Sequence, residues 1–243
     1  MRLSETAFSE AVNKQGTDGG IGTLSEKSLH RILKYTVDPC VENHEVSCLG
    51  SIVDVRNEGG IFEIQTGSLL PLKSKLIKLL SEYKVTVVYP IPRIKRLVWI
   101  DKDSGEATEP RRSNKRGKFS DSLPELSKIE SLLFSDDLTV KLVLLDLDEY
   151  KYLDGYGESK KKRATKIERI PTALADEIDI NSKEDILKIL PPLPEIFTAA
   201  DFNKATGLRK KRAFFSLKLL LNIGAAERIG KRGNAFLYSL LTN

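Results

Sequence analysis

The spacing of apolar residues predicts alternating helices and strands over residues 24–147 of the chain. Amphipathic spacing at the helical period appears in three segments, 24–37, 69–83 and 123–134. Runs of β-branched or alternating apolar residues predict strands at 50–56, 61–66, 85–89, 93–101 and 138–147. The glycine-rich sequence NEGG joins the first two strands and suits a hairpin, whereas Pro90 and Pro92 are expected to end the strand at 85–89. This order predicts an α/β fold with a mixed central sheet flanked by helices.

Residues 151–195 are expected to form an extension or connector after the last predicted strand. Pro191, Pro192 and Pro194 prevent regular helix at its end and mark the clearest domain boundary. The basic run at 160–163 is interpreted as a solvated loop, with contact to phosphates as the alternative. We therefore expect three parts, at residues 1–150, 151–192 and 193–243.

Capping and helix-ending residues divide residues 193–243 into short elements. Thr198 and Asp201 have the spacing of a capping box and open a helix at 199–206, which Gly207 ends. A second helix is expected from Leu208 or Arg209 to Asn222, with its buried side formed by Ala213, Phe214, Leu217, Leu220 and Leu221. After Gly224, two short strands are expected at 225–229 and 235–240, around a hairpin tip at 230–234.

Composition describes a globular protein whose charge is unevenly distributed. Hydrophobic residues make up 40% and charged residues 30%, and no apolar run approaches the roughly 18 residues of a membrane span. The lack of a signal peptide and the two cysteines make a cytoplasmic location, away from membranes, the default expectation. Net charge is +5, yet residues 204–243 carry nine basic residues and one acidic residue, a net +8 that leaves about −3 elsewhere. This concentration favours a polyanion-binding site at the C-terminus.

Helix, turn, helix and a basic-tipped hairpin resemble the winged helix-turn-helix family over residues 193–243. The resemblance implies binding to duplex DNA, with the second helix in a major groove. The residues that would contact phosphates or base edges lie at the start of that helix and on the hairpin: Arg209, Lys210, Lys211, Arg212, Lys231 and Arg232. The alternative is contact with a protein partner, and a homodimer is also left open.

Two carboxylates and an amide lie on the predicted hairpin in the pattern D-x8-E-x-Q. Asp54 is on the first strand, and Glu63 and Gln65 share one face of the second because side chains alternate along a strand. Carboxylates on neighbouring strands repel one another, and an oxygen-preferring cation such as Mg²⁺ or Mn²⁺ relieves that repulsion. Such an ion can orient a phosphodiester and lower the pKa of a bound water. The pattern therefore predicts a metal site.

This arrangement resembles the PD-(D/E)XK phosphodiesterase superfamily, which has the fold of restriction endonucleases. Its order of helix, strand with Asp, strand with Glu, helix and strand matches residues 24–90. The resemblance implies that Asp54 and Glu63 bind the metal and that Glu26 assists the metal or a water. It also implies that Gln65 takes the position of the usual lysine.

The glutamine departs from the family pattern, because it offers a neutral dipole where lysine would stabilise developing charge. Lys73 or Lys75, on the following helix, is the candidate replacement. The implied function is a Mg²⁺-dependent DNA endonuclease whose winged helix positions the N-terminal nuclease core on duplex DNA. The alternative is a non-catalytic DNA-binding regulator whose nuclease-like N-terminal domain serves dimerisation or ligand sensing.

Other chemistries find less support. The glycine cluster before the first predicted helix lacks the lysine and hydroxyl residue of a phosphate loop. With only His30 and His44, and no G-x-S-x-G sequence, a serine hydrolase triad is not expected. Cys40, His44 and Cys48 are spaced four apart, but a proline among them argues against one helix presenting all three. A small buried cysteine pair is the ordinary interpretation.

Overall fold

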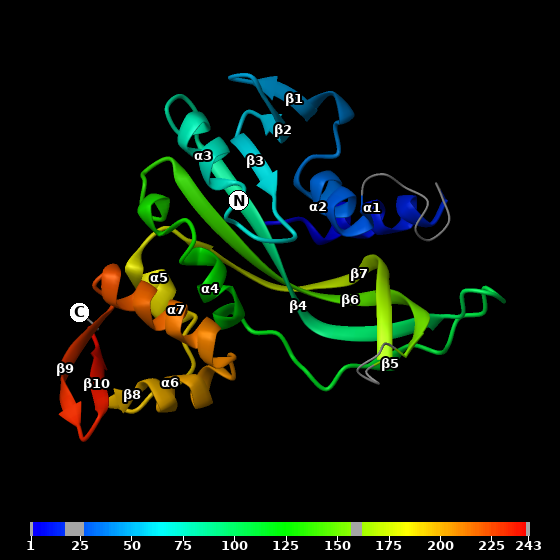
Figure 1. The fold of residues 1–243 in the computed structure, drawn as a ribbon. Coiled ribbons are helices and arrows are strands. Elements are labelled where there is room, and N and C mark those ends of the chain that lie inside the picture. The colour runs from blue at the N-terminus through cyan, green and yellow to red at the C-terminus, as the bar shows by residue number, and fades with distance from the viewer. Residues whose placement is uncertain (1, 18–26, 157–161, 242–243) are drawn as a thin grey trace.

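The computed structural model describes residues 2–17, 27–156 and 162–241. A large mixed sheet with helices on both faces forms most of it, and a smaller three-stranded sheet with two helices lies at the C-terminal end (Figure 1). No helix in these ranges is long and apolar enough to cross a membrane. The predicted α/β architecture, a central mixed sheet flanked by helices, is confirmed.

The large sheet has the strand order β1-β2-β3-β4-β6-β7, with β5 paired to the outer part of β4. The strands are β1 His44–Cys48, β2 Ser51–Asn57, β3 Gly60–Ile64, β4 Val85–Ile100, β5 Arg111–Arg112, β6 Leu138–Tyr156 and β7 Lys162–Ile180. β3 pairs with β4, and β4 with β6, in parallel, whereas the other neighbours are antiparallel. The sequence did not predict β1 as a separate strand.

The predicted hairpin is confirmed as β2 and β3, joined at Glu58 and Gly59. Its tight turn depends on Gly60, whose φ of 111° lies in a region that favours glycine. A Cβ atom on Gly60 would also lie 2.6 Å from the carbonyl oxygen of Lys84, at the start of β4. The turn therefore fixes how closely the hairpin approaches β4.

The prediction that Pro90 and Pro92 end a strand was wrong, because β4 runs through both. The carbonyl oxygen of Val88 accepts a hydrogen bond from the backbone N–H of Gln65. Because backbone groups alternate sides along a strand, those of Pro90 and Pro92 also point toward the β3 side of β4. β3 ends at Ile64, opposite Val88, and the two prolines therefore face an edge where no strand needs an N–H donor. An irregularity between Pro92 and Ile94 then shifts the register with β6.

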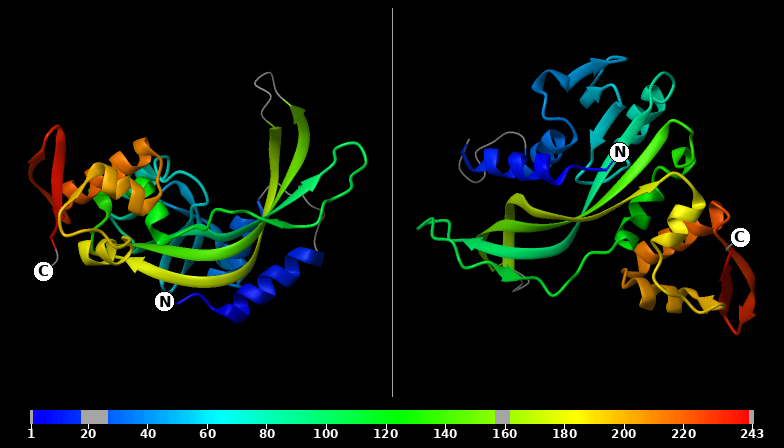
Figure 2. Two further views of the ribbon diagram at one scale, coloured as in Figure 1. Left: turned by 90° about the horizontal axis from the view of Figure 1, so that it is seen from below. Right: turned by 180° about the vertical axis from the view of Figure 1, so that it is seen from behind.

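The connector prediction for residues 151–195 was also wrong at the level of secondary structure. β6 continues to Tyr156, and β7 returns antiparallel to it as an edge strand of the central sheet. β4, β6 and β7 are the longest strands of the sheet, and the blue helix α1 runs alongside their outer part (Figure 2). The basic run predicted as a loop lies partly outside the described residues, since these resume at Lys162 in β7.

Two hydrophobic layers pack against the large sheet. The helices are α1 Glu5–Thr17, α2 Ser28–Val37, α3 Lys73–Leu79, α4 Leu123–Leu126 and α5 Lys183–Lys188, and short 3₁₀ turns lie at Val41–Asn43, Phe119–Ser122 and Glu130–Leu132. Side chains of α2 pack on one face with Phe62 and Val88, whereas α3 and α4 pack on the other with Val85 and Val87. The sequence missed α1, and α3 and α4 are shorter than predicted.

The C-terminal elements match their predictions closely. They are β8 Phe197–Thr198, α6 Ala199–Thr206, α7 Lys210–Asn222, β9 Ala226–Arg232 and β10 Ala235–Leu240, with strand order β8-β10-β9. The Thr198 and Asp201 capping box is present, and Gly207 ends α6 in the left-handed conformation. The short strand β8 was not predicted. Apolar residues of α6 and α7 belong to the same core cluster as those of α3 and α4, so this unit packs against the large sheet's helices.

Candidate functional site

Asp54 and Glu63 lie where β2 and β3 separate. The pairing of the two strands runs from Asn57 with Gly60 to Val55 with Phe62, and both carboxylates follow directly beyond it. The Oδ2 atom of Asp54 accepts a hydrogen bond of 2.7 Å from the backbone N–H of Ile64, in place of a strand-to-strand contact. The hairpin therefore brings the two predicted acidic residues to one end of its ladder.

Glu63 is a buried carboxyl group with one cationic neighbour. Only 4% of the residue is exposed, and Lys75 Nζ of α3 lies 2.5 Å from its Oε1 atom. Lys75 is the cation that faces this oxygen atom, so the two largely buried side chains form an ion pair. Burial raises the pKa of Glu63 to about 7 against the opposing effect of Lys75, and the negative charge of Asp54 raises it further.

The pKa of Asp54 is lowered, whereas that of the neighbouring Glu63 is raised. His30 Nε2, on α2, is 3.1 Å from Asp54 Oδ2. Burial acts to raise the pKa of Asp54, but the hydrogen bond and charge of His30, the N–H of Ile64 and the charge of Lys75 together hold it below its ordinary value. Asp54 is therefore the ionised member of the pair, and Glu63 is the one that titrates near neutrality.

Gln65, which was expected at the position of the usual lysine, contacts the backbone of the loop after β3. Gln65 directs its amide nitrogen to the carbonyl oxygen of Ser68, at 2.5 Å, and so supports the loop after β3. The positive charge comes from Lys75, one of the two lysines considered as a replacement, while Lys73, the other, is the first residue of α3. Glu26, the third predicted acidic residue, lies outside the described residues.

No larger cluster of metal-ligating side chains forms in the described part of the chain, the surroundings of Asp54 and Glu63 included. Within residues 2–17, 27–156 and 162–241, no group of three or more His, Cys, Asp or Glu side chains is arranged to hold a metal ion. The interpretation of Cys40 and Cys48 as a buried pair was wrong. Cys40 is exposed and donates to Glu42, whereas Cys48 is buried in β1 beside Arg56.

The predicted nucleic-acid residues occupy two different environments. Arg209, Lys210 and Lys211 are exposed at the start of α7, and Lys231 and Arg232 are exposed at the end of β9. Arg212 instead turns toward the central sheet, where its guanidinium donates to the carbonyl oxygen of Asp121 at 2.9 Å. Five of these six cations are therefore available on the outside of the C-terminal unit.

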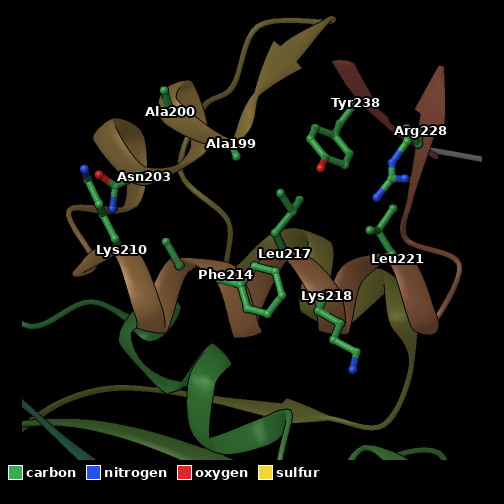
Figure 3. Close-up of a pocket in the computed structure, with 11 residues that line it drawn as sticks. Ala199, Ala200, Asn203, Lys210, Phe214, Leu217, Lys218, Leu221, Arg228 and Tyr238 are labelled. Carbon is green, nitrogen blue, oxygen red and sulfur yellow. The ribbon is translucent and has the colours of Figure 1, made fainter. Parts of the chain in front are cut away.

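A pocket of about 580 Å³ lies between α6, α7 and the β9–β10 hairpin (Figure 3). Leu217 and Leu221 line its base, and Lys210, Lys218 and Arg228 contribute its charged atoms. Phe214 was predicted to be buried, but 64% of it is exposed beside this pocket. The buried side of α7 is rotated from the prediction and consists of Ala213, Ser216, Leu217, Leu219 and Leu220.

A second charged cluster, around Glu149 on β6, was missed by the sequence analysis. Glu149 is 1% exposed, and four cations approach its carboxylate: Lys151 at 2.9 Å, Arg169 at 3.1 Å, Lys95 at 3.3 Å and Lys166 at 3.7 Å. Burial acts to raise the pKa of Glu149, but the hydrogen bond from Lys151 and the charges of Lys95 and Lys166 lower it to about 2. No local signal marked it, because Glu149 lies beyond the strand predicted at 138–147 and its cationic partners come from β4, β6 and β7.

Comparison with known proteins gives a family and one curated relative. Residues 27–181 match the model of a family described as "Domain of unknown function (DUF8091)". This chain belongs to that family. An "Uncharacterized protein" of Treponema pallidum (strain Nichols) is 32% identical over 221 residues, which cover 90% of this chain and 86% of the relative. No solved structure matches.

The family match covers the acidic pair on β2 and β3 as well as the Glu149 cluster on β6 and β7. It ends before α5 and does not include the C-terminal unit. The match to the Treponema protein, which extends over most of both chains, therefore reaches further than the family match.

Proposed function

We propose that this protein is a Mg²⁺-dependent DNA endonuclease in which Asp54 and Glu63 hold the metal ion. The observation that carries the proposal is the buried Glu63 carboxyl beside Asp54, whose pKa is raised to about 7 although Lys75 lies 2.5 Å away. A strongly perturbed acid with a specific charged neighbour is typical of functional sites. Its place, at the end of the β2–β3 hairpin, is the one that the PD-(D/E)XK resemblance assigns to metal ligands.

The topology around this pair supports the same resemblance. α2 precedes three consecutive antiparallel strands, and α3 connects the third of them to the parallel strand β4. A parallel crossover through a helix places β3 and β4 side by side, with the acidic pair at the end of β3. This order extends the one predicted from sequence, since β1 adds a strand before Asp54.

The donor set fits a divalent cation of the magnesium type. Two neighbouring carboxylates supply the oxygen atoms that such ions prefer, and a cation bound between them would relieve their mutual repulsion. Such an ion, when bound, would polarise the phosphodiester and lower the pKa of an attacking water. Lys75, at 2.5 Å from Glu63, is placed to neutralise charge that develops on the phosphate oxygens, and His30 orients Asp54 through its hydrogen bond.

The C-terminal unit is proposed to bind duplex DNA as a winged helix. The elements α5, β8, α6, α7, β9 and β10 follow one another as a helix, a strand, two helices and a hairpin. Exposed cations stand on α7 and on the hairpin, where Arg228 and Lys231 stack over the ring of Phe236 at 3.8 and 4.6 Å. These positions suit contacts to phosphates on either side of a helix that lies in a groove.

A second function, that of a non-catalytic DNA-binding regulator, is favoured by the short contact between Lys75 and Glu63. A lysine at 2.5 Å already offsets part of the carboxylate charge, and a structural ion pair would need no metal. The two functions make different predictions. A regulator binds DNA with an affinity that is indifferent to divalent metal and to Glu63, whereas the nuclease requires both for cleavage.

The test is a cleavage assay on linear, branched and single-stranded DNA with Mg²⁺ or Mn²⁺. We expect cleavage by the wild-type protein and a loss of about a thousandfold or more in the Asp54→Ala/Glu63→Ala variant, because several kcal/mol of metal-dependent stabilisation is removed. The matched control, Glu58→Ala/Glu82→Ala, removes two exposed carboxylates of the same domain and should cleave normally. Full activity in the first variant, or no cleavage of any DNA by the wild type, contradicts the proposal.

A further inference from the structure

A cavity of about 290 Å³ lies between the middle of β4, the segment that leads into α4, and the start of α7. Its floor is the stretch of β4 from Tyr89 to Pro92. Four cations line it, namely Lys95, Lys115, Arg169 and Arg212, against a single lining carboxylate, that of Asp121. We call it the basic cavity. Its lining comes from parts of the chain that are distant in sequence, so the fold assembles it.

One wall of the basic cavity is held in place by a close backbone contact. The N–H of Gly117 donates to the carbonyl oxygen of Arg93 at 3.0 Å. A Cβ atom on Gly117 would lie 2.1 Å from the carbonyl oxygen of Pro92, so only glycine permits this approach. The contact sets the segment that carries Lys115 directly against the floor of the cavity. Arg212 closes another side through its hydrogen bond to the Asp121 carbonyl.

The charges around the basic cavity do not balance. Lys95 and Arg169 share the carboxylate of Glu149 with two further lysines, Lys151 and Lys166. Lys115 Nζ lies 3.6 Å from Asp121 Oδ2, the second carboxylate of the group. Among the residues that line the cavity, four cations face one carboxylate, and an anion placed among them would relieve their mutual repulsion.

The pKa shifts of Lys166 and Tyr89 describe the electrostatic environment of this region. Desolvation lowers the pKa of Lys166, and the neighbouring cations Arg169, Lys95 and Lys151 lower it further against the effect of Glu149. Burial and the charge of Glu125 raise the pKa of Tyr89 to about 12, so its hydroxyl is a neutral hydrogen-bond donor at the edge of the cavity. Cations and a hydroxyl donor together suit the oxygens of a phosphate group.

The basic cavity lies on the same face of the sheet as Glu63. Strand β3 pairs with β4 so that Glu63 is opposite Val87, and Tyr89 is two residues further along β4. Val87 and Ile91 belong to the core cluster on the α3 and α4 side, and Tyr89 packs against that cluster. At about 3.3 Å per strand residue and about 4.8 Å between strands, the Tyr89 position is roughly 8 Å from the Glu63 position. A DNA strand that reaches the acidic pair could therefore place a nearby phosphate of the same strand at the cavity.

We propose that the basic cavity binds a backbone phosphate of the DNA strand whose scissile bond lies at Asp54 and Glu63. This inference rests on the proposed nuclease function and names the path of its substrate. The strand extends from the acidic pair to Lys95, Lys115 and Arg169, which line the cavity. The start of α7, through Arg212, then connects this path to the exposed cations of the C-terminal unit.

The experiment measures equilibrium binding of labelled DNA to the full-length protein in EDTA, where no cleavage occurs. In the Lys95→Gln/Lys115→Gln variant we expect affinity to fall about tenfold or more, and the slope of log affinity against log salt to decrease by about 2. The matched control, Lys78→Gln/Lys84→Gln, removes two exposed lysines near the opposite end of β3 and should stay within about twofold of wild type. Lys115→Glu alone, at a side chain that is 67% exposed, tests the same point without disturbing Glu149.

A second arm distinguishes a nucleic-acid phosphate from that of a free nucleotide. Calorimetry with AMP should show weak binding that the Lys95→Gln/Lys115→Gln variant loses together with its DNA affinity. Loss of AMP binding with unchanged DNA affinity would overturn the assignment to a DNA strand. DNA and AMP binding that both remain at the wild-type level would overturn the cavity as a phosphate site.

The outcome is separable from that of the nuclease proposal. Reduced DNA affinity in a protein that cleaves no DNA would contradict the nuclease function and leave the phosphate site standing. Wild-type affinity in the Lys95→Gln/Lys115→Gln variant, in a protein whose cleavage depends on Glu63, would contradict the phosphate site alone.

Discussion

Glu63 on β3 and Glu149 on β6 are buried to nearly the same degree in the same sheet, with 4% and 1% of each residue exposed. Their pKa values nevertheless move in opposite directions, to about 7 and to about 2. One lysine approaches Glu63, next to a second carboxylate, whereas four cations approach Glu149. Burial alone therefore does not decide the charge of a carboxyl group in this protein, because the number of compensating cations does.

The difference also indicates what each region is suited to bind. The Glu63 region holds two neighbouring carboxylates, one of which has a raised pKa, so a divalent cation would relieve their repulsion. The Glu149 region has more cations than its carboxylate needs, so an anion would complete it. A metal ion and a phosphate are the two components of a metal-assisted phosphodiester hydrolysis. The two regions are thus complementary halves of the proposed site.

Of the single substitutions at Glu63 and Glu149, Glu63→Gln is expected to change the free energy of unfolding most. The pKa of Glu63 is raised from 4.5 to about 7 by folding, so its ionisation opposes folding. The wild type should lose about 3 kcal/mol of unfolding free energy, relative to Glu63→Gln, as pH rises from roughly 4.5 to 7 without divalent metal. Chemical denaturation at several pH values measures the difference. Glu58→Gln is the control, and a pH-independent difference for Glu63→Gln would break the comparison.

Replacing Glu149 by glutamine should act over a different pH range and with the opposite sign. The pKa of Glu149 is lowered from 4.5 to about 2, so its ionised form stabilises the fold above pH 4.5 and that stability is lost as pH falls toward 2. Because the surrounding cations are partly exposed, we expect Glu149→Gln to be about 2 kcal/mol less stable than wild type at pH 7, and less different at low pH.

The same Glu149→Gln substitution should raise the affinity for DNA. It removes one negative charge from a group that already has excess cations, so binding at low salt should strengthen by about twofold to tenfold. Anisotropy measurements on labelled DNA would show this directly. Weaker binding by a variant that remains folded would mean that Glu149 positions the cations rather than merely offsetting them.

Local signals explain why the hairpin and the C-terminal elements were predicted well. The NEGG turn, the Thr198–Asp201 capping box and Gly207 each determine the backbone conformation of only a few neighbouring residues. Asp54 and Glu63 could be placed together because a hairpin fixes their register. Even Lys75 was a named candidate, since it lies on the helix after β3.

The elements and contacts that sequence reasoning missed depend on distant partners. β4 continues through two prolines only because β3 ends before them, which no local pattern reveals. The cations around Glu149 come from β4, β6 and β7, and one of them is 54 residues away along the chain. Phe214 was assigned to the wrong side of α7 because helical periodicity gives a buried face only to within about one residue position.

The central claim is that Glu63 belongs to a site for a divalent cation, and calorimetric titration with Mn²⁺ tests it most directly. Wild-type protein and Glu63→Gln are compared at pH 6 and pH 8, with Glu58→Gln as the control. Because the pKa of Glu63 is about 7, the account predicts one site in the wild type whose affinity rises about tenfold between these pH values. It also predicts that Glu63→Gln loses this site. Equal Mn²⁺ binding by the wild type and Glu63→Gln, or no binding by either, would contradict the account.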